Sequence, residues 1–313
     1  MADILTVTLN PAVDVSTSVA RLEPSHKLRC AHERRDAGGG GINVARVIRR
    51  LGGDVTAAFP SGGPIGALLE RLVAQEDVAS LAVAMGGDTR ESFTVIEEET
   101  GREYRFVLPG PAVGAQEFQE FVAAIAAPAS RARFVVFSGS LPPGTPNDAF
   151  AVLADAVRRE DTKVVFDAPG AALKAALARG IYLVKPSLRE LQDLTGRALS
   201  TDDAIIAAAR ELVASKQAEI VAVTLGGRGA ILVTQDQVLA ADALPVAVAS
   251  SVGAGDSFLG AMVWALAASQ SIEDAFRYAM AAGASSLMSP GTQLCQRADM
   301  VRLADEVRVR KAL

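Results

Sequence analysis

The stretch from Ser251 to Leu266 reads SVGAGDSFLGAMVWAL and joins two kinds of sequence. Its second half is a run of apolar and small residues, which predicts a buried helix. Its first half places Gly253, Ala254 and Gly255 where that helix begins. Backbone N–H groups have no partner inside a helix at this point, and the helix dipole attracts anions there. Since glycine lets an anion approach the backbone closely, the stretch predicts an anion hole.

Asp256 follows these glycines, and the motif itself contains no basic residue. A carboxylate at a helix start is often only an N-cap. A carboxylate beside an anion hole also suits phosphoryl transfer, in which the hole stabilises the moving group and the carboxylate accepts a proton. Because the reference pKa of Asp is about 3.9, the side chain is too weak a base to ionise an alcohol in advance. We expect Asp256 to orient a hydroxyl and to accept its proton late.

Outside this stretch, short apolar runs alternate with helical patterns. The runs predicted to be strands are Ile4–Leu9, Asp54–Phe59, Phe134–Ser138, Lys163–Asp167, Tyr182–Val184, Glu219–Thr224 and Ala230–Val233. The helical patterns include Gly66–Glu76, Asn147–Glu160 and Thr201–Ser215. This alternation predicts a single α/β domain over residues 1–313, with a mostly parallel central sheet covered by helices on both faces. Ligands of such sheets bind beyond the C-terminal ends of the strands.

Two segments break the alternation and predict a small separate sheet. Residues 15–35 are extended in character, and residues 90–108 read as a hairpin with its turn at 98–101. A small sheet is not stable alone, so we expect it to serve as a lid over the site, as a dimer contact, or as both. Lys27 and Arg29 are predicted to share one face of a strand. The basic residues of these segments form either a solvated surface or a phosphate clamp: Lys27, Arg29, Arg34, Arg35, Arg90, Arg102 and Arg105.

The glycine run Gly38–Gly41 leads directly into a second regular helical pattern. It is neither a Walker loop nor a dinucleotide fingerprint, since no Gly-Lys-Ser/Thr follows and the glycines are contiguous. A flexible linker is the alternative, but a linker does not lead into so regular a helix. We expect Asn43 in the first turn to bond sugar hydroxyls, and Arg46, Arg49 and Arg50 to lie on the helix surface.

Polar residues also follow the predicted strands. Asp14 can accept two hydrogen bonds from a vicinal diol, and Ser140 can bond a sugar oxygen, although each alone is more often a surface carboxylate or a turn hydroxyl. Residues 185–191 open a helix in which Glu190 can hold Mg²⁺ through water, and Ser187 is a cap in the simpler interpretation. Residues 224–229 are similar to nucleotide-contacting turns.

Composition narrows the classes of function. The formal charge of −5 argues against a general nucleic-acid or membrane-surface protein. The two cysteines have no metal-type spacing and suit a reducing compartment. The first residues lack the pattern of a signal peptide, and no apolar run reaches the length of a membrane span. We therefore expect a soluble cytoplasmic protein.

Taken together, these motifs resemble the ribokinase/PfkB family of carbohydrate kinases over nearly the whole chain. Residues 38–46 are similar to the N-terminal signature of the family, and residues 252–257 to its C-terminal signature. The phosphosugar branch is most similar, and within it the minor bacterial 6-phosphofructokinase type. The stretches that support this branch are 8–11, 27–30, 38–41, 104–110, 138–144 and 291–295.

The resemblance implies a role for each matching position. It implies a base at Asp256 with an anion hole at Gly253, Ala254 and Gly255. The sugar would contact Asp14, Gly39, Asn43 and Ser140. The sugar phosphate would contact Lys27, Arg90 and Arg105, with Lys27 reaching in from a partner subunit. ATP would lie along Lys185, Ser187, Thr224, Gly226, Gly229 and Ser251.

The resemblance also concerns metal ions. It implies that Glu190 helps to place Mg²⁺. Members of the family often bind K⁺ beside the anion hole through backbone carbonyls, and the matching region here contains Ser250, Val252, Ser286, Ser289 and Gly291. Two departures bear on these ions. Ser187 stands where the family usually has Asn, in an Asn-x-x-Glu pattern that ends at Glu190, and Ser289-Pro290 and Gln293 differ from the family's pattern beside the K⁺ region.

These observations lead to a first hypothesis and several rivals. The hypothesis is phosphorylation of D-fructose 6-phosphate at its 1-hydroxyl by MgATP, a step of glycolysis that gives fructose 1,6-bisphosphate and ADP, by a homodimer paired through its lids. Fructose 1-phosphate and tagatose 6-phosphate are alternative substrates. A catalytically silent sugar-phosphate sensor is an alternative of another class, and a nucleoside kinase is a third, which has no use for a basic lid.

Overall fold

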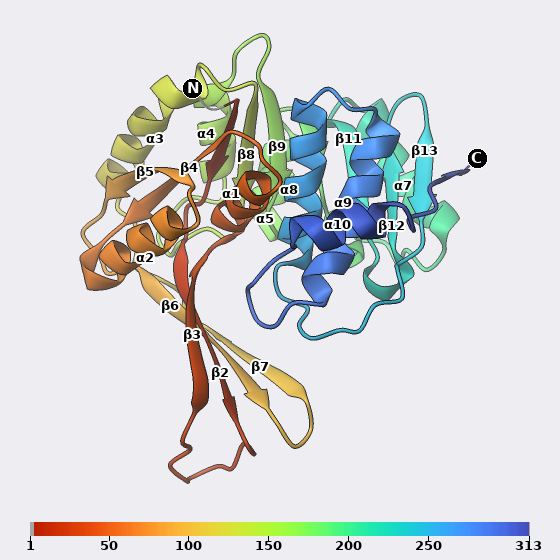
Figure 1. The fold of residues 1–313 in the computed structure, drawn as a ribbon. Coiled ribbons are helices and arrows are strands. Elements are labelled where there is room, and N and C mark those ends of the chain that lie inside the picture. The colour runs from red at the N-terminus through yellow and green to blue at the C-terminus, as the bar shows by residue number, and fades with distance from the viewer. Residues whose placement is uncertain (1–2, 313) are drawn as a thin grey trace.

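The computed structural model describes residues 3–312, which form two β-sheets and the helices around them (Figure 1). The strands of the main sheet are β1 (Ile4–Val7), β4 (Val55–Ser61), β5 (Ala79–Ala84), β8 (Phe134–Ser138), β9 (Lys163–Asp167), β10 (Ile181–Val184), β11 (Ala218–Thr224), β12 (Ala230–Val233), β13 (Val238–Ala241) and β14 (Arg310–Ala312). Their spatial order is β14-β13-β12-β11-β10-β9-β8-β1-β4-β5. Neighbours from β11 to β5 are parallel, and the three pairs beyond β11 are antiparallel.

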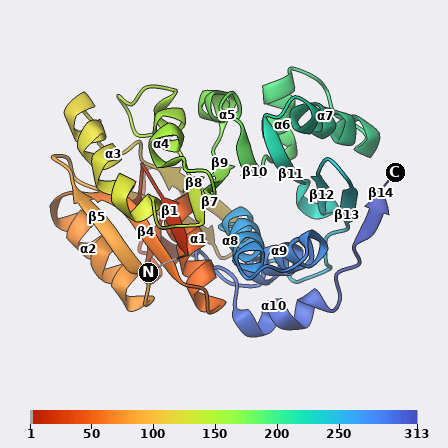
Figure 2. The ribbon, with the colours of Figure 1, turned by 90° about the horizontal axis from the view of Figure 1, so that it is seen from above.

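Helices cover both faces of this sheet, as predicted (Figure 2). One layer contains α3 (Ala115–Ala129), α4 (Ala149–Val157), α5 (Gly170–Leu177), α6 (Leu188–Thr195) and α7 (Asp202–Ala214). The other contains α1 (Gly40–Arg50), α2 (Gly63–Gln75), α8 (Ala254–Ala267), α9 (Ile272–Leu287) and α10 (Arg297–Ala304). Strand side chains alternate between the two, since Ile4 joins the core under the second layer and Leu5 the core under the first.

An aromatic cluster holds the middle of the sheet to the first layer. The ring of Phe150 on α4 lies edge-on to Phe137 of β8 at 5.9 Å and to Phe166 of β9 at 5.2 Å, measured between ring centroids. Both strand residues come immediately before a polar residue at the strand's C-terminal end, Ser138 and Asp167. The packing therefore fixes the edge of the sheet at which polar groups gather.

The smaller sheet has the order β3-β2-β6-β7, with strands β2 (Ala12–Val19), β3 (Ala31–Gly38), β6 (Arg90–Glu97) and β7 (Arg102–Val107), and we call it the lid sheet. It projects from the main body, as the lower part of Figure 1 shows. The predicted separate sheet is thus confirmed, and the hairpin turns at 98–101, where Gly101 N–H bonds the carbonyl of Glu97. The placement of Lys27 and Arg29 on a strand is wrong, because residues 20–30 form the loop between β2 and β3.

The predicted strands agree with the structure to within two residues at each end. Helix α2 begins at Gly63, three residues before its predicted start, with a proline in its first turn. No helix within residues 3–312 is long and apolar enough to cross a membrane.

Candidate active site

The residues predicted to form the anion hole lie at the N-terminus of α8. Gly253 is its N-cap residue, with φ 76°, a left-handed conformation that glycine adopts without strain. A Cβ atom on Gly255 would lie 3.3 Å from the Nζ atom of Lys185. The structure therefore places the Lys185 ammonium beside the first N–H groups of the helix. This residue, which directly follows β10, supplies the basic side chain that the motif lacks.

Lys185 forms a buried ion pair with Asp167, the last residue of β9. The Nζ and Oδ2 atoms are 3.0 Å apart, and the two side chains are 6% and 14% exposed. Burial raises the pKa of Asp167 to about 6 in spite of Lys185. Burial acts to lower the pKa of Lys185, but Asp167, together with Asp256 and Glu190, outweighs burial, and the pKa is raised. Sequence reasoning missed Asp167, although its position at the end of a predicted strand is the signal that singled out other site residues.

Asp256 lies in the first turn of α8 and is held by Asn43 from the first turn of α1. The Nδ2 atom of Asn43 donates a hydrogen bond to Oδ2 of Asp256 over 2.9 Å. Burial raises the pKa of Asp256, while the Asn43 bond and the charges of Lys185, Arg105 and Arg46 oppose that rise. A raised pKa makes the carboxylate a better proton acceptor than an exposed Asp, as late general-base chemistry requires.

The glycine run 38–41 lets α1 begin close to β1 and β8. A Cβ on Gly38 would collide with the Asp14 carboxylate, and one on Gly41 would lie 2.6 Å from Oγ1 of Thr8. Thr8 supplies the missing helix cap, since the Ile42 N–H donates to its Oγ1 over 2.9 Å. Gly39 is the N-cap residue itself. The run thus brings Asp14 and Asn43 to one place.

Asp14 and the basic lid residues meet where the lid sheet joins the main body. Burial raises the pKa of Asp14 to about 6, opposed by Arg105 and then Arg90. The guanidinium of Arg90 donates to the carbonyls of Asn10 and Leu108 over 3.0 and 2.8 Å. Asn10 in turn donates to Oγ of Ser140 over 3.3 Å. Positive charge therefore faces a carboxylate and a hydroxyl at the lid.

Lys27 is not brought to this place within one chain. It is exposed in the loop at the far end of β2 from Asp14. Any contact between Lys27 and a sugar phosphate at Asp14 therefore needs a second subunit.

The remaining residues predicted to contact the nucleotide lie along two adjacent turns. Ser187 caps α6, and its N–H and Oγ donate to Oε2 of Glu190 over 2.7 and 2.8 Å. Ser187 and Thr224 pair as a parallel bridge, and Gly226–Arg228 forms a short 3-10 helix before Gly229. Ser251 is exposed beside the anion hole. Both bonds fall on one Glu190 oxygen, so the other is available for a metal ion or its water.

The region matched to K⁺ binding is compact and rich in oxygen atoms. Ser250 is buried, and its Oγ donates to Glu103 Oε2 of the lid over 2.8 Å. Ser286 Oγ is buried without a hydrogen-bond partner, 4.0 Å from where a Cβ on Gly253 would lie. An unsatisfied buried oxygen beside the anion hole fits a site for a cation. Val252 and Ser289 are also buried, and a Cβ on Gly291 would lie 2.8 Å from Ser16 Oγ of the lid. Within residues 3–312, no cluster of His, Cys, Asp and Glu side chains has the composition of a metal site.

The predicted surface position of Arg46 is wrong. The residue was expected on the surface of its helix, but its side chain is fully buried. It reaches Glu76 at 2.7 Å and the carbonyl of Ala37 at 2.8 Å, and burial of an arginine requires such partners.

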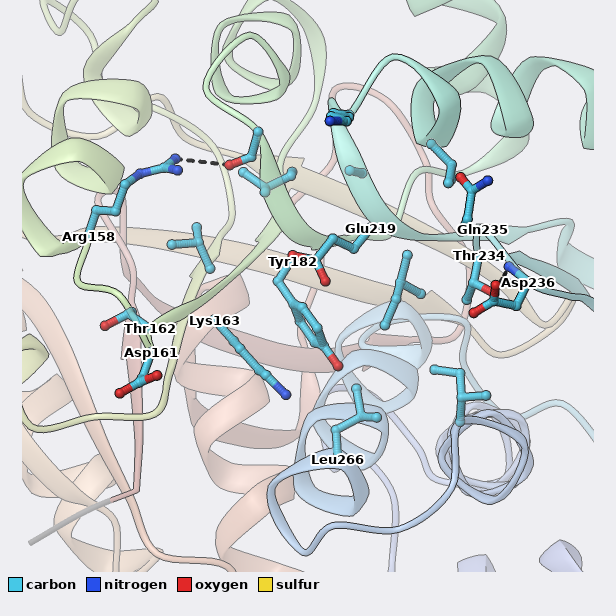
Figure 3. Close-up of a pocket in the computed structure, with 18 of the residues that line it drawn as sticks. Arg158, Asp161, Thr162, Lys163, Tyr182, Glu219, Thr234, Gln235, Asp236 and Leu266 are labelled. Carbon is cyan, nitrogen blue, oxygen red and sulfur yellow. Dashed lines mark hydrogen bonds between the residues drawn. The ribbon is translucent and has the colours of Figure 1, made fainter.

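A large depression of about 1330 Å³ lies elsewhere, at the N-terminal ends of β9, β10 and β11 (Figure 3). There Lys163 extends over the ring of Tyr182, with Nζ 4.6 Å from the ring centroid. This is the opposite edge of the sheet from Asp167, Lys185 and Asp256. Because parallel sheets bind ligands at their C-terminal edge, we assign the site to that edge and not to the depression.

Comparison with known proteins identifies the family of the chain. The model of the pfkB family carbohydrate kinases matches residues 4–299. The chain belongs to this family. A curated relative, the ATP-dependent 6-phosphofructokinase isozyme 2 of Mycobacterium tuberculosis, is 42% identical over 96% of this chain and 88% of its own. A 1-phosphofructokinase of Xanthomonas campestris is 37% identical over 84% of this chain and 83% of its own.

Solved structures of related kinases have the same fold as this chain. The phosphofructokinase-2 of Escherichia coli in complex with fructose 6-phosphate superposes with a TM-score of 0.92 at 39% identity, over 98% of this chain and 99% of the other. The same protein in complex with potassium gives a TM-score of 0.93 at 40% identity, with the same coverage. The ribokinase-like α/β fold is thereby confirmed for this chain.

Proposed function

We propose that this kinase transfers the γ-phosphoryl group of ATP to the 1-hydroxyl of D-fructose 6-phosphate. The observation that carries the proposal is the placement of Asp256, which lies at the anion-hole helix with Asn43 and Lys185 around it. A second, basic end of the site is formed by Arg90 and Arg105 near Asp14. A phosphorylated ketohexose has an acceptor hydroxyl at one end and a phosphate at the other, which matches this distribution of charge.

Each side chain then has a task. Asp14 accepts hydrogen bonds from ring hydroxyls, and Asn43 holds the Asp256 carboxylate in place. As the sugar oxygen forms its bond to the γ-phosphorus, its proton passes to Asp256, and the bond to the β,γ-bridging oxygen breaks to leave ADP. The N–H groups of residues 253–255 and the Lys185 ammonium stabilise the charge on the group in transit.

Two metal ions belong to the proposal. Mg²⁺, when bound to ATP, neutralises phosphate charge, and Glu190 would hold it through water. K⁺ would be held near Ser286 and Ser250, in the region where a buried hydroxyl lacks a partner. The solved potassium complex of the E. coli phosphofructokinase-2 supports the inclusion of K⁺ in the proposal. Steady-state rates with K⁺ replaced by a bulky organic cation test it, and an unchanged rate would remove K⁺ from the proposal.

The substrate test is a panel of phosphorylated sugars with MgATP. We expect the highest kcat/KM with fructose 6-phosphate. Because a relative is named 1-phosphofructokinase, fructose 1-phosphate is the strongest competitor, and tagatose 6-phosphate is the next. A clearly higher kcat/KM for either sugar would overturn the assignment of the substrate while leaving the phosphotransferase activity in place.

A silent sugar-phosphate sensor is separated from an enzyme by Asp256→Asn. The amide keeps the shape of the side chain but cannot accept the proton, so we expect sugar-phosphate affinity to persist and turnover to fall by a factor on the order of 10²–10⁴. Calorimetry and product assays measure the two effects. Equal turnover of the variant would remove Asp256 from its role.

We propose a cytoplasmic homodimer in which each chain is one kinase domain and the lid sheets pair. Phe106 and Val107 at the end of β7 and the following Leu108 are 51%, 59% and 45% exposed, and β3 and β7 are the unpaired edges of the lid sheet. Exposed apolar edge strands favour association. Both free cysteines suit a reducing compartment. Light scattering at micromolar concentration tests the dimer, and Val107→Asp should give monomers that have lost the partner's Lys27.

A further inference from the structure

Behind the pair of Asn43 and Asp256 lies a buried charge network that the proposed mechanism does not use. Its centre is Arg46, one turn beyond Asn43 on α1. The Nη1 atom of Arg46 donates to Oδ1 of Asn43 over 3.2 Å and to the carbonyl of Ala37 over 2.8 Å. Its Nε and Nη2 atoms donate to Glu76 over 3.1 and 2.7 Å. Each of the three guanidinium nitrogens donates to a backbone carbonyl or to a carboxylate, so the guanidinium is held in one orientation.

The bond from Arg46 decides which way the Asn43 amide faces. A primary amide has an acceptor and a donor that exchange places when it rotates by half a turn. Arg46 can only donate, so it fixes Oδ1 on its own side and leaves Nδ2 toward Asp256. With the amide reversed, Oδ1 would face the carboxylate, and two acceptors would oppose each other. Arg46 therefore selects the amide orientation that bonds the catalytic base.

Asp36, near the end of β3, joins the same network to the lid sheet and to the segment that contains Thr292. Its Oδ1 accepts from Arg34 of the lid at 2.6 Å, and its Oδ2 accepts from Thr292 over 2.8 Å. Arg46 Nη2 lies 3.7 Å from Asp36 Oδ1. Asp36 and Thr292 are both buried. The lid strand and the segment that contains Gly291 thus meet at the carboxylate that faces Arg46.

We propose that Arg46 is a positioning residue that fixes the Asn43 amide against the catalytic base Asp256, and that Asp36 ties this arrangement to the lid and to Thr292. The inference rests on the proposed phosphoryl transfer for its kinetic consequences, but the orientation of the amide does not depend on which sugar reacts. Arg46 touches no reacting atom, and it acts only through Asn43.

A purely structural role for Arg46 predicts a different outcome. If Arg46 only holds α1 to the end of α2 through its ion pair with Glu76, its loss would lower the stability of the fold but leave the rate of the reaction unchanged. Glu76→Gln is the matched control, because it weakens the same ion pair but leaves the Arg46 bond to Asn43. The two variants also change the charge near the base in opposite directions.

The first test is kinetic. Arg46→Met should lower kcat roughly 100-fold, since small misplacements of a catalytic group have effects of that size, and should raise the apparent pKa of the acid limb of the kcat profile. The sign follows from charge, because Arg46 is one of the groups that oppose the raised pKa of Asp256. The groups that act on Asp256 are Asn43 of α1, Lys185 after β10, Arg105 of β7, Arg46 of α1 and the Asp167 carboxylate of β9. Glu76→Gln should leave the acid limb in place or lower it.

The second test does not use activity. The side-chain NH₂ of Asn43, assigned by its loss in Asn43→Ser, should exchange slowly with solvent in the unmodified protein and in Glu76→Gln, and rapidly in Arg46→Met. An Arg46→Met protein that is folded by circular dichroism but keeps both the protected amide and the acid limb would overturn the inference. If the Asn43 amide exchanges rapidly in Arg46→Met but the unmodified protein phosphorylates no sugar, the positioning role stands and only the proposed function is overturned.

Discussion

The ammonium of Lys185 lies 3.0 Å from the carboxylate of Asp167, and this buried pair stands next to the anion hole of α8. Lys185→Met would leave Asp167 buried without its cation. Breaking a buried pair costs about 3–5 kcal/mol, so we expect a loss of that order at pH 8. A carboxyl whose folded pKa is raised is favoured at low pH and loses that contribution as pH rises through the folded pKa, so the loss should be smaller at pH 5. Urea unfolding at both pH values measures it.

The double variant Lys185→Met with Asp167→Asn is the control for this experiment. It removes both charges, so most of the stability lost at pH 8 should return. An equal loss for Lys185→Met at pH 5 and pH 8 would contradict the account of the pair.

A second prediction concerns Gly38, whose missing side chain makes room for Asp14. A Cβ at this position would collide with the Asp14 carboxylate. Gly38→Ala should therefore displace Asp14 and raise the KM for the sugar phosphate by about tenfold or more, with the KM for ATP unchanged within a factor of about two. Gly114→Ala is a matched control away from the site, since a Cβ there makes only an ordinary contact with Glu117 at 3.5 Å. Parallel increases in both KM values of Gly38→Ala would argue for general damage.

A third prediction follows from the pKa of Asp14, which burial raises to about 6. Below that pH the side chain is mostly protonated and loses acceptor capacity, so the KM for the sugar should rise as pH falls from 7 to 5. Asp14→Asn should show a high KM with a much flatter pH dependence. Because ionising Asp14 costs folding free energy between pH 3.8 and 6, the stability of Asp14→Asn relative to the unmodified protein should increase over that range, by on the order of 1–3 kcal/mol. Chemical denaturation across pH checks the sign.

The parts of the site that the sequence predicts are those whose position follows from neighbouring residues in the chain. The strand β8, the start of α1 and the helix after Gly253 follow from period and glycine content, which are local properties. Asp14 and Ser140 were found because polar residues end predicted strands. Arg46 was expected on a surface because charged residues on amphipathic helices usually lie there, but its side chain is buried and contacts Glu76 and Ala37.

Pairing over long sequence distances accounts for what was missed. Lys185 was named as an ATP contact, but no local pattern indicates that Asp167 pairs with it beside the N-terminus of α8. The strands β5, β13 and β14 were not predicted, and β14 and β5 are the edges of the main sheet, where burial patterns are weak. The position of Lys27 in a loop was missed for a similar reason, since alternating residues near Pro24 read as a strand.

The last prediction addresses Ser187, which stands where the family usually has Asn. Its Oγ donates to Glu190 Oε2 over 2.8 Å and accepts from the Glu190 N–H over 3.3 Å, so it both caps α6 and holds the carboxylate. Asn caps helices about as well as Ser, so Ser187→Asn should change stability by less than about 0.5 kcal/mol. Its longer amide reaches farther toward phosphate and metal-bound water, so the Mg²⁺ concentration for half-maximal rate should fall by up to roughly tenfold. Ser187→Ala is the companion variant, and it should cost about 1 kcal/mol and raise that concentration, because it loses both hydrogen bonds. Reaction rates measured against Mg²⁺ concentration at fixed ATP, together with thermal unfolding of the two variants, test this prediction. An identical Mg²⁺ requirement in all three proteins would show that residue 187 acts only as a helix cap.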